Sequence, residues 1–262
     1  MKEAFFKFIM NVLKFGIGAY LVLAVILAFN QSTLLFFPSH NPNKNESWIV
    51  GKDYYGVKFI AKDPRHIFLM MHGNGGQADN RGYFFKVLPQ DSSLYVFEYP
   101  GYGQRKGAIT QGSINAAALK AYDSLKSEFP NIPTTIVGES VGTGAASYVA
   151  SQRAAKDLVL VTPYHDLPSL AQEKISLFPT YWLCAYRWNI AELLKDFKGR
   201  ITIIGASNDE VIPLHHAKKL AHDLPSARFE IVNGGHNSYD MDAMKNILQE
   251  ACINLSTSQA RP

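Results

Sequence analysis

Beyond residue 40, short apolar segments rich in β-branched and aromatic residues alternate with segments whose apolar positions follow a helical period. We predict strands at residues 55–62, 66–72, 93–99, 134–138, 158–161, 200–205 and 229–232. Helical segments lie at residues 79–88, 113–129 and 142–155, and each of the last two strands is followed by another. This alternation predicts an α/β fold, with a mostly parallel sheet and helices on both faces.

The amino-terminal segment has a different pattern. Residues 15–29 contain no charged side chain, and the apolar stretch extends back to Phe8 with only Asn11 and Lys14 interrupting it. A helix over residues 8–29 would rise about 33 Å, enough to cross a hydrocarbon core of about 30 Å. Lys14 lies about a third of the way along this helix and can extend its ammonium group toward the interface.

Three interpretations of this segment compete. A cleaved signal peptide needs small residues at its cleavage site, and Ala28-Phe29-Asn30 is a poor one. A core helix would be apolar on one face, whereas this segment is apolar all round. We therefore predict an uncleaved transmembrane anchor, with a secreted or periplasmic protein after signal cleavage as the alternative. Residues 1–32 then form a cytoplasmic stub and anchor, and residues 33–262 form the α/β domain.

The lysines around the apolar stretch predict its topology. Lys2, Lys7 and Lys14 precede or open it, and no Lys or Arg follows it before Lys44. Because positively charged flanks tend to stay in the cytoplasm, we expect a cytoplasmic amino terminus and an exported α/β domain.

Composition narrows the class of protein. Apolar residues make up 47% and charged residues 18%, which is typical of a chain that buries a core. The net charge of +4 is too small and too scattered to indicate nucleic-acid binding. Cys184 and Cys252 form no CxxC motif, which argues against a zinc cluster, an iron–sulfur site and a dense disulfide framework. We predict no metal site and no cofactor. A bridge between these two cysteines stays open.

The strand at 134–138 continues directly into Gly138-Glu139-Ser140-Val141-Gly142, a G-x-S-x-G motif, and a helical pattern follows at once. The pentapeptide alone is a common chance match, but a strand before it and a helix after it form the context of a nucleophilic serine. In that context the tight turn presents the hydroxyl above the sheet. We predict Ser140 as a nucleophile, with a glycine-rich turn and a helix-capping serine as the alternative.

A serine hydroxyl needs a base to take its proton and an acid to orient that base. Asp209 follows the strand at 200–205, and His236 lies in the loop after the strand at 229–232. Each residue taken singly has an ordinary explanation, Asp209 as a helix cap and His236 as a surface loop residue. Together with Ser140 they stand in one order at the carboxyl ends of strands, so we predict His236 as base and Asp209 as its partner.

Other residues remain alternatives for these roles. Glu210 is the first alternative acid and Asp166 the second, while His165, near a strand end, is the rival base. The remaining histidines of the carboxyl-terminal half fall in a predicted helix and are expected to face solvent: His215, His216 and His222.

Acyl transfer also needs hydrogen-bond donors for the oxyanion that develops. We expect one from the backbone N–H of Val141, directly after the serine. The strand at 66–72 leads into His72-Gly73-Asn74-Gly75-Gly76, where glycines allow an N–H to turn inward, and we predict that of Asn74 as the second donor. His72 is expected to brace this loop. The alternative is a merely flexible glycine loop.

Six segments together resemble one family: QSTLLFFP at 31–38, HGNGG at 72–76, EYPGYG at 98–103, GESVG at 138–142, NDEVIP at 208–213 and GGHN at 234–237. The chain from about Leu34 onward resembles a serine hydrolase of the α/β-hydrolase superfamily, in particular the small membrane-anchored abhydrolase-domain proteins. The resemblance implies the same triad and the same oxyanion amides. One departure is Gln104-Arg105-Lys106 after Gly103, where such proteins often carry a small residue; it concerns the rim on the substrate side.

About forty residues join the strands near 160 and 203, which leaves no room for a large cap domain and predicts a site open to bulky substrates. Two interpretations fit the many aromatic residues of this connection. Either they pack against the sheet, or they form an acyl-chain groove or a surface that rests on a bilayer. They are Phe178, Tyr181, Trp182, Tyr186 and Trp188.

These features predict a serine hydrolase that cleaves a carboxylic ester or thioester of a lipid-like or acylated substrate through an acyl-enzyme on Ser140. A peptidase of the same fold and a non-catalytic binding protein are the alternatives. The expected partners are the acyl substrate and the lipid bilayer, with no nucleic acid. The sequence indicates neither an oligomeric state nor an acyl chain length.

Overall fold

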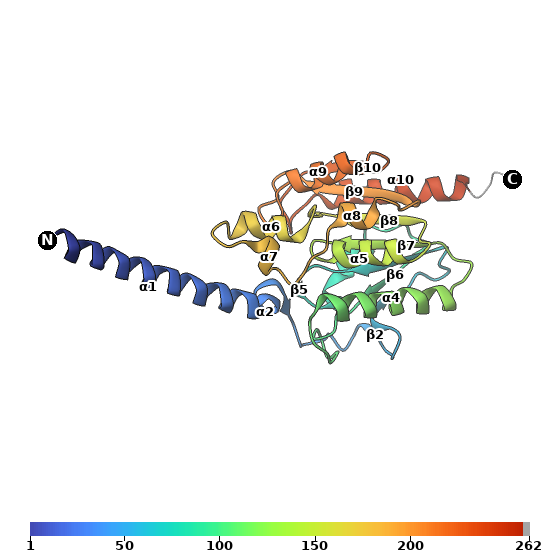
Figure 1. Cartoon of the computed structure of the whole chain (residues 1–262). Coiled ribbons are helices and arrows are strands. Elements are labelled where there is room, and N and C mark those ends of the chain that lie inside the picture. The colour runs from blue at the N-terminus through green and yellow to red at the C-terminus, as the bar shows by residue number, and fades with distance from the viewer. Residues whose placement is uncertain (259–262) are drawn as a thin grey trace.

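The structure is a computed structural model that describes residues 1–258, and for side chains residues 1–250. A long helix projects from one side of an α/β domain (Figure 1). Cys252, one of the two cysteines, lies outside the residues whose side chains are described, and Cys184 forms no disulfide with any residue whose side chain is described.

The domain is built on an eight-stranded sheet of order β10-β9-β8-β7-β4-β6-β3-β2. Strands β10 to β6 are parallel, while β2 and β3 add an antiparallel edge. The strands are β2 (Ser47–Val50), β3 (Tyr55–Phe59), β4 (His66–Met71), β6 (Ser92–Phe97), β7 (Thr134–Glu139), β8 (Asp157–Val161), β9 (Arg200–Ala206) and β10 (Arg228–Val232). A separate parallel pair joins β1 (Phe37–Pro38) to β5 (Gly75–Gly76).

Helices cover both faces of this sheet, as the alternation of elements predicts. The helices are η1 (Ala78–Arg81), α3 (Gly82–Phe85), α4 (Gln111–Glu128), α5 (Gly142–Gln152), α6 (Leu167–Lys174), α7 (Thr180–Leu183), α8 (Ile190–Leu194), α9 (His215–Asp223) and α10 (Met241–Ser258). One core cluster contains apolar residues of α4, α5, α6, α8 and α9, and the other contains those of η1, α3 and α10.

The central strand β4 shows how the two clusters arise. All six of its residues are buried, as in a parallel strand that is covered on both faces. Ile67 and Leu69 point into the first cluster, whereas Phe68 and Met70 point into the second. The period-two alternation of side chains thus divides one apolar run between two cores.

One predicted helix differs in the structure. Residues 79–88 were expected to form a single helix, but they form the 3₁₀ turn η1 followed by the short helix α3. The N–H of Gln77 donates to Oδ1 of Asn80 at 3.0 Å and the N–H of Asn80 donates to the carbonyl of Gln77 at 3.1 Å, so a tight local turn forms at the start of this segment. Boundaries also shift elsewhere; β3 ends at Phe59 where its pairing with β6 ends.

The connection from β8 to β9 holds only the short helices α6, α7 and α8, so no separate cap domain covers the carboxyl ends of the strands. The aromatic residues of this connection divide between the two interpretations. Tyr186 and Trp188 are buried in the core, whereas Tyr181 and Trp182 are 49% and 85% exposed.

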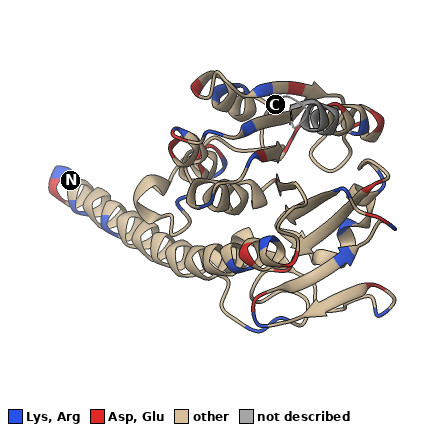
Figure 2. Cartoon of the chain, turned by 90° about the vertical axis from the view of Figure 1, so that its right-hand side faces the viewer, with Lys and Arg blue, Asp and Glu red and all other residues tan. Residues whose placement is uncertain are grey.

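The amino-terminal helix α1 runs over Lys2–Phe29, and α2 (Gln31–Leu35) follows it. No residue of α1 is buried, which excludes the interpretation of α1 as a core helix. Its most apolar 18-residue window has a mean hydropathy of 2.3, so α1 is long and apolar enough to cross a membrane. Figure 2 shows that its charges gather toward the amino-terminal end, and the half next to the domain is uncharged.

Candidate active site

Ser140 stands in a sharp turn between β7 and α5. Its φ angle is +54°, a left-handed conformation that is costly for a residue with a side chain. The turn requires glycine on both sides. A Cβ atom at Gly142 would lie 2.1 Å from the main-chain oxygen of Met71, and one at Gly138 would lie 2.6 Å from Cα of Thr143. The G-x-S-x-G spacing therefore follows from close backbone packing as well as from the turn.

The structure brings Ser140, His236 and Asp209 into one hydrogen-bonded chain. Nε2 of His236 lies 2.9 Å from Oγ of Ser140. Nδ1 of the same ring lies 2.8 Å from Oδ2 and 3.0 Å from Oδ1 of Asp209. The side chain of Asp209 is 1% exposed and that of His236 is 6% exposed, so little water competes for these bonds.

Asp209 is held by the backbone of its own loop. Its Oδ1 accepts hydrogen bonds from the N–H groups of Val211 (2.9 Å) and Ile212 (2.7 Å), which fixes the carboxylate at the end of β9. Asp209 thus closes a turn within its own loop while it contacts His236, and it caps no helix, since the N-cap of α9 is Leu214. The helix α9 begins only at His215, so Pro213 precedes this helix and does not lie in its first turn.

The alternative acids and base occupy other positions. Glu210 reaches only the backbone N–H of His236, at 3.3 Å, and not its ring. Asp166 caps α6 by accepting from the N–H of Ser169 at 2.9 Å. His165 lies between Asp166 (Nδ1 to Oδ2, 3.1 Å) and Asp223 (Nε2 to Oδ2, 2.7 Å). None of these three alternatives hydrogen-bonds Ser140.

The glycine loop after β4 is held in place by several contacts. A Cβ atom at Gly73 would lie 3.6 Å from Cβ of Ser140, so the loop passes directly beside the serine. The carbonyl of Asn74 accepts from Phe37 N–H (2.9 Å) and from the hydroxyl of Tyr102 (2.6 Å). Its side-chain amide donates to the carbonyl of Leu35 (2.7 Å). The loop is therefore braced on both sides.

His72 holds this loop against the buried carboxylate of Glu98. Its Nδ1 lies 2.7 Å from the carbonyl oxygen of Gly73 and its Nε2 lies 3.1 Å from Oε1 of Glu98, a residue that is fully buried. Among the hydrogen bonds of the described residues, none is donated by the backbone N–H of Asn74 or of Val141. Both amides are therefore available as donors to a ligand.

Sequence reasoning missed a buried polar cluster behind the serine. The carboxylate of Glu139 accepts from the hydroxyls of Tyr83 and Tyr239, the latter at 2.8 Å, and Nε of Arg81 lies 3.8 Å from it. Burial is the larger cause and the negative charge of Glu139 the second; together they raise the pKa values of Tyr83 and Tyr239 well above the usual range of a tyrosine. The only signal in the sequence was an acidic residue beside the serine in an otherwise apolar strand end.

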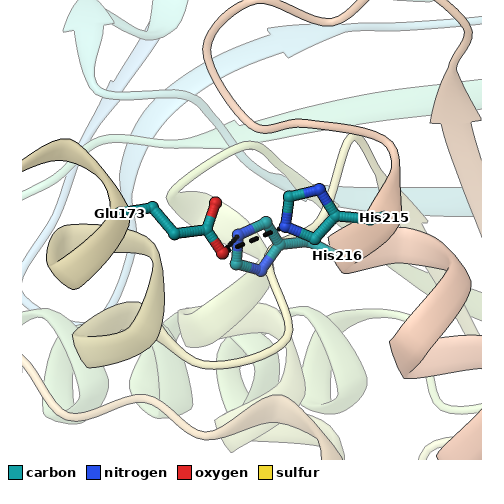
Figure 3. Close-up of side chains that lie close together, drawn as sticks. All are labelled: Glu173, His215 and His216. Carbon is teal, nitrogen blue, oxygen red and sulfur yellow. Dashed lines mark hydrogen bonds and ion pairs between the residues drawn. The ribbon is translucent and has the colours of Figure 1, made fainter.

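A second polar cluster joins α6 to α9, where Glu173, His215 and His216 converge (Figure 3). His216 is 2% exposed, so the prediction that it faces solvent is wrong; it lies on the inner side of α9. Its Nδ1 accepts from the N–H of His165 (3.4 Å), and its Nε2 lies 3.2 Å from Glu173. Because Nδ1 accepts an N–H, the ring carries its single proton on Nε2 and is neutral, and burial lowers the pKa of His216. A protonated Nε2 cannot bind a metal, so this arrangement fits a neutral polar contact with Glu173 better than a metal site.

Comparisons with known proteins extend this picture. No family model matches the chain. It is 25% identical over 199 residues to the lysophosphatidylserine lipase ABHD12 of Xenopus tropicalis. This alignment covers 68% of this chain and 52% of the relative. It is 24% identical to an uncharacterized protein of Mycobacterium tuberculosis over 85% of this chain and 89% of the relative. The chain spans about half the length of the lipase relatives that it matches.

Solved structures share the same architecture. Est1E of Butyrivibrio proteoclasticus, solved with ferulic acid bound, has a TM-score of 0.64 at 14% identity, over 75% of this chain and 93% of that one. MenH of Staphylococcus aureus has a TM-score of 0.58 at 14% identity, over 74% of this chain and 96% of that one. The chain thus has the α/β-hydrolase fold, and its sequence is similar to those of abhydrolase-domain proteins such as the lysophosphatidylserine lipases.

Proposed function

We propose that the protein is a serine hydrolase that cleaves a carboxylic ester or thioester of a lipid-like substrate through an acyl-enzyme on Ser140. The observation that carries this proposal is the imidazole of His236, which lies within hydrogen-bond distance of the Ser140 hydroxyl on one side and of the Asp209 carboxylate on the other. The printed name of the curated relatives, lysophosphatidylserine lipase, supports a lipid ester as substrate.

The first half of the reaction forms the acyl-enzyme. Oγ of Ser140 attacks the carbonyl carbon of the ester while its proton moves to Nε2 of His236. The carboxylate of Asp209 holds the Nδ1 proton and stabilises the imidazolium that forms. The developing oxyanion accepts hydrogen bonds from the N–H groups of Asn74 and Val141. The tetrahedral intermediate then collapses, and the leaving alkoxide or thiolate takes the proton from His236.

The second half repeats these steps with water. His236 removes a proton from a water molecule, which attacks the acyl carbon, and the proton then returns to Oγ of Ser140 as the acid is released. A peptidase would use the same steps on an amide. A binding protein would need none of them, so an intact proton pathway favours an enzyme over that alternative.

The same proposal includes the arrangement in the membrane. We propose that residues 1–32 form the cytoplasmic stub and anchor, and residues 33–262 the hydrolase domain on the far side. The uncharged, unburied half of α1 supports the anchor, and the lysines at its amino-terminal end support the direction. A reporter that is active only in the cytoplasm, fused after Pro262, should stay inactive.

Covalent labelling with a fluorophosphonate tests the catalytic role. The probe should label the protein, and Ser140→Ala should abolish the labelling, because the probe reacts with an activated serine. Ser151→Ala is the matched control, since Ser151 lies on the same helix α5 and should leave labelling unchanged. Labelling that persists in Ser140→Ala would assign the nucleophile elsewhere. Comparing p-nitrophenyl esters with p-nitroanilides then separates an esterase from a peptidase.

A further inference from the structure

An apolar groove of about 430 Å³ lies between the amino-terminal helices and the α6–α7 segment. Its lining is mainly apolar and includes leucines of four helices, together with Ala171, Phe178 and Tyr186, while Gln31, Lys174 and Thr180 add polar groups. The leucines are Leu27 of α1, Leu34 and Leu35 of α2, Leu167 and Leu170 of α6, and Leu183 of α7. This volume falls within the range of about 300–1,000 Å³ of small-molecule sites.

We propose that this groove binds the acyl chain of a lipid ester that enters from the bilayer alongside α1, with the ester group at Ser140. This inference rests on the proposed function and adds to it the class of substrate, a long-chain acyl ester held in a membrane, and the route by which the chain reaches the site.

The groove adjoins the proposed catalytic residues at two points. Val211 lines the groove, and its own N–H donates to Oδ1 of Asp209 at 2.9 Å. Leu35 lines the opposite wall, and its carbonyl accepts from the side chain of Asn74 at 2.7 Å. One wall is therefore hydrogen-bonded to the acid of the proposed triad, and the other is hydrogen-bonded to the proposed oxyanion loop. A chain lying in the groove would place its carboxyl end near both.

The other side of the groove follows α1. The hydroxyl of Tyr20 donates to the carbonyl of Leu177 at 3.1 Å, and its ring stacks on Phe178 with centroids 5.0 Å apart. The side chain of Gln31 bonds the backbone of the segment after α7 through Leu183 O (2.6 Å) and Ala185 N (2.6 Å). The α6–α7 segment is thus attached to α1 through Tyr20 and to α2 through Gln31.

These contacts set the depth of the segment relative to the helix. Tyr20 lies nine residues before Phe29, the last residue of α1, which corresponds to about 14 Å along the helix axis. If α1 crosses the bilayer, the chain around Leu177 lies beside it at hydrocarbon depth. The exposure of this segment fits that position, because Leu177 is 73% exposed and Trp182 is 85% exposed. Large apolar surfaces of this kind mark contacts with membranes or partners.

Filling the groove tests the acyl-chain site. We would reconstitute the full chain in phosphatidylcholine vesicles and compare Ala171→Phe with Ala221→Phe, a half-buried alanine of α9 outside the groove. Each methylene withdrawn from water favours binding about fourfold. Loss of room for two or more methylenes should therefore lower kcat/KM for p-nitrophenyl palmitate at least tenfold. Hydrolysis of p-nitrophenyl acetate should stay within twofold.

A second groove variant guards against misfolding. Leu34 on α2 is 55% exposed, so Leu34→Trp adds volume to the groove without straining the core, and it should reproduce the selective loss on the palmitate ester. An equal effect on both esters, or none on either, would overturn the groove assignment. If acetate hydrolysis itself does not depend on Ser140, the proposed function fails first, so the two failures are distinguishable.

A measurement without catalysis tests the entry from the bilayer. Brominated phosphatidylcholine quenches tryptophans that lie among acyl chains. Trp182 is the expected target, since Trp188 is buried in the core and Trp48 is half-buried in the edge strand β2. Quenching should fall markedly in Trp182→Phe. Quenching that is the same in Trp182→Phe as in the unchanged protein would place this segment outside the bilayer and contradict the proposed route.

Discussion

Replacing Asp209 by Asn is the most informative single change at the proposed site. Oδ1 of Asp209 is held by two backbone N–H groups, those of Val211 and Ile212, and needs to remain an acceptor. In Asp209→Asn the amide oxygen therefore keeps that position. The amide NH₂ then takes the place of Oδ2, 2.8 Å from Nδ1 of His236.

This exchange reverses the tautomer of His236. Because the amide NH₂ is a donor, Nδ1 has to accept, and the ring proton moves to Nε2, which faces Oγ of Ser140 at 2.9 Å. A protonated Nε2 cannot take the serine proton. Serine hydrolases lose about 10⁴-fold in kcat from the corresponding change, which equals about 5 kcal/mol of transition-state stabilisation. The backbone bonds survive, so we expect little change in melting temperature.

The assay is hydrolysis of a p-nitrophenyl ester, with Glu210→Gln as matched control. Glu210 is adjacent and reaches only the backbone N–H of His236, so its variant should keep activity within a few fold. A loss of less than tenfold in Asp209→Asn, in a protein that melts normally, would refute the role of this carboxylate. A severe loss in Glu210→Gln alone would transfer the role to Glu210.

Three further predictions concern stability. Gly142→Ala should destabilise the protein by about 3 kcal/mol or more, because the new methyl group meets a main-chain oxygen of β4 at 2.1 Å. The control Gly112→Ala should leave stability unchanged, because nothing lies within 4 Å of the added methyl group. Thermal unfolding compares the two variants. Burial lowers the pKa of His66 to about 4, so the unfolded chain, with a pKa near 6.5, takes up a proton that the folded chain does not. Stability should fall by about 2 kcal/mol between pH 7 and pH 5 in urea titrations; an unaltered pH slope in His66→Asn would contradict this. Tyr239→Phe removes a bond to the Glu139 carboxylate and should cost about 1.5–3 kcal/mol of unfolding free energy; an unchanged urea midpoint would show that this bond contributes nothing.

Local patterns allowed most elements of the fold to be predicted. A buried parallel strand such as β4 is apolar along its whole length, and the helices between strands keep their own period, so the α/β class follows from neighbours in the chain. Two segments differ: residues 79–88 form a turn and a short helix, and the edge strand β2 (Ser47–Val50) was not among the predicted strands. In the segment 79–88 the side chain of Asn80 accepts from the backbone N–H of Gln77, and that competition between side chain and backbone has no hydrophobic period to reveal it.

Burial of polar groups was harder to predict. His216 has the same residue type and the same helix as His215, yet one is buried and the other exposed, because α9 packs on the sheet with one face. The cluster around Glu139 draws on Tyr83 and Tyr239, which lie far from it in the chain. Neither result follows from local pattern, since each depends on which elements become neighbours in the sheet.

By itself, the sequence determined the class of fold, the strained serine turn and the loops that end the strands, because these depend on residues within a few positions of one another. Only the tertiary structure decided which carboxylate meets His236, since Asp209, Glu210 and Asp166 all follow strands and are chemically equivalent as partners. The choice depends on the order of β8, β9 and β10 in the sheet and on two backbone N–H groups that turn one of the three toward the ring.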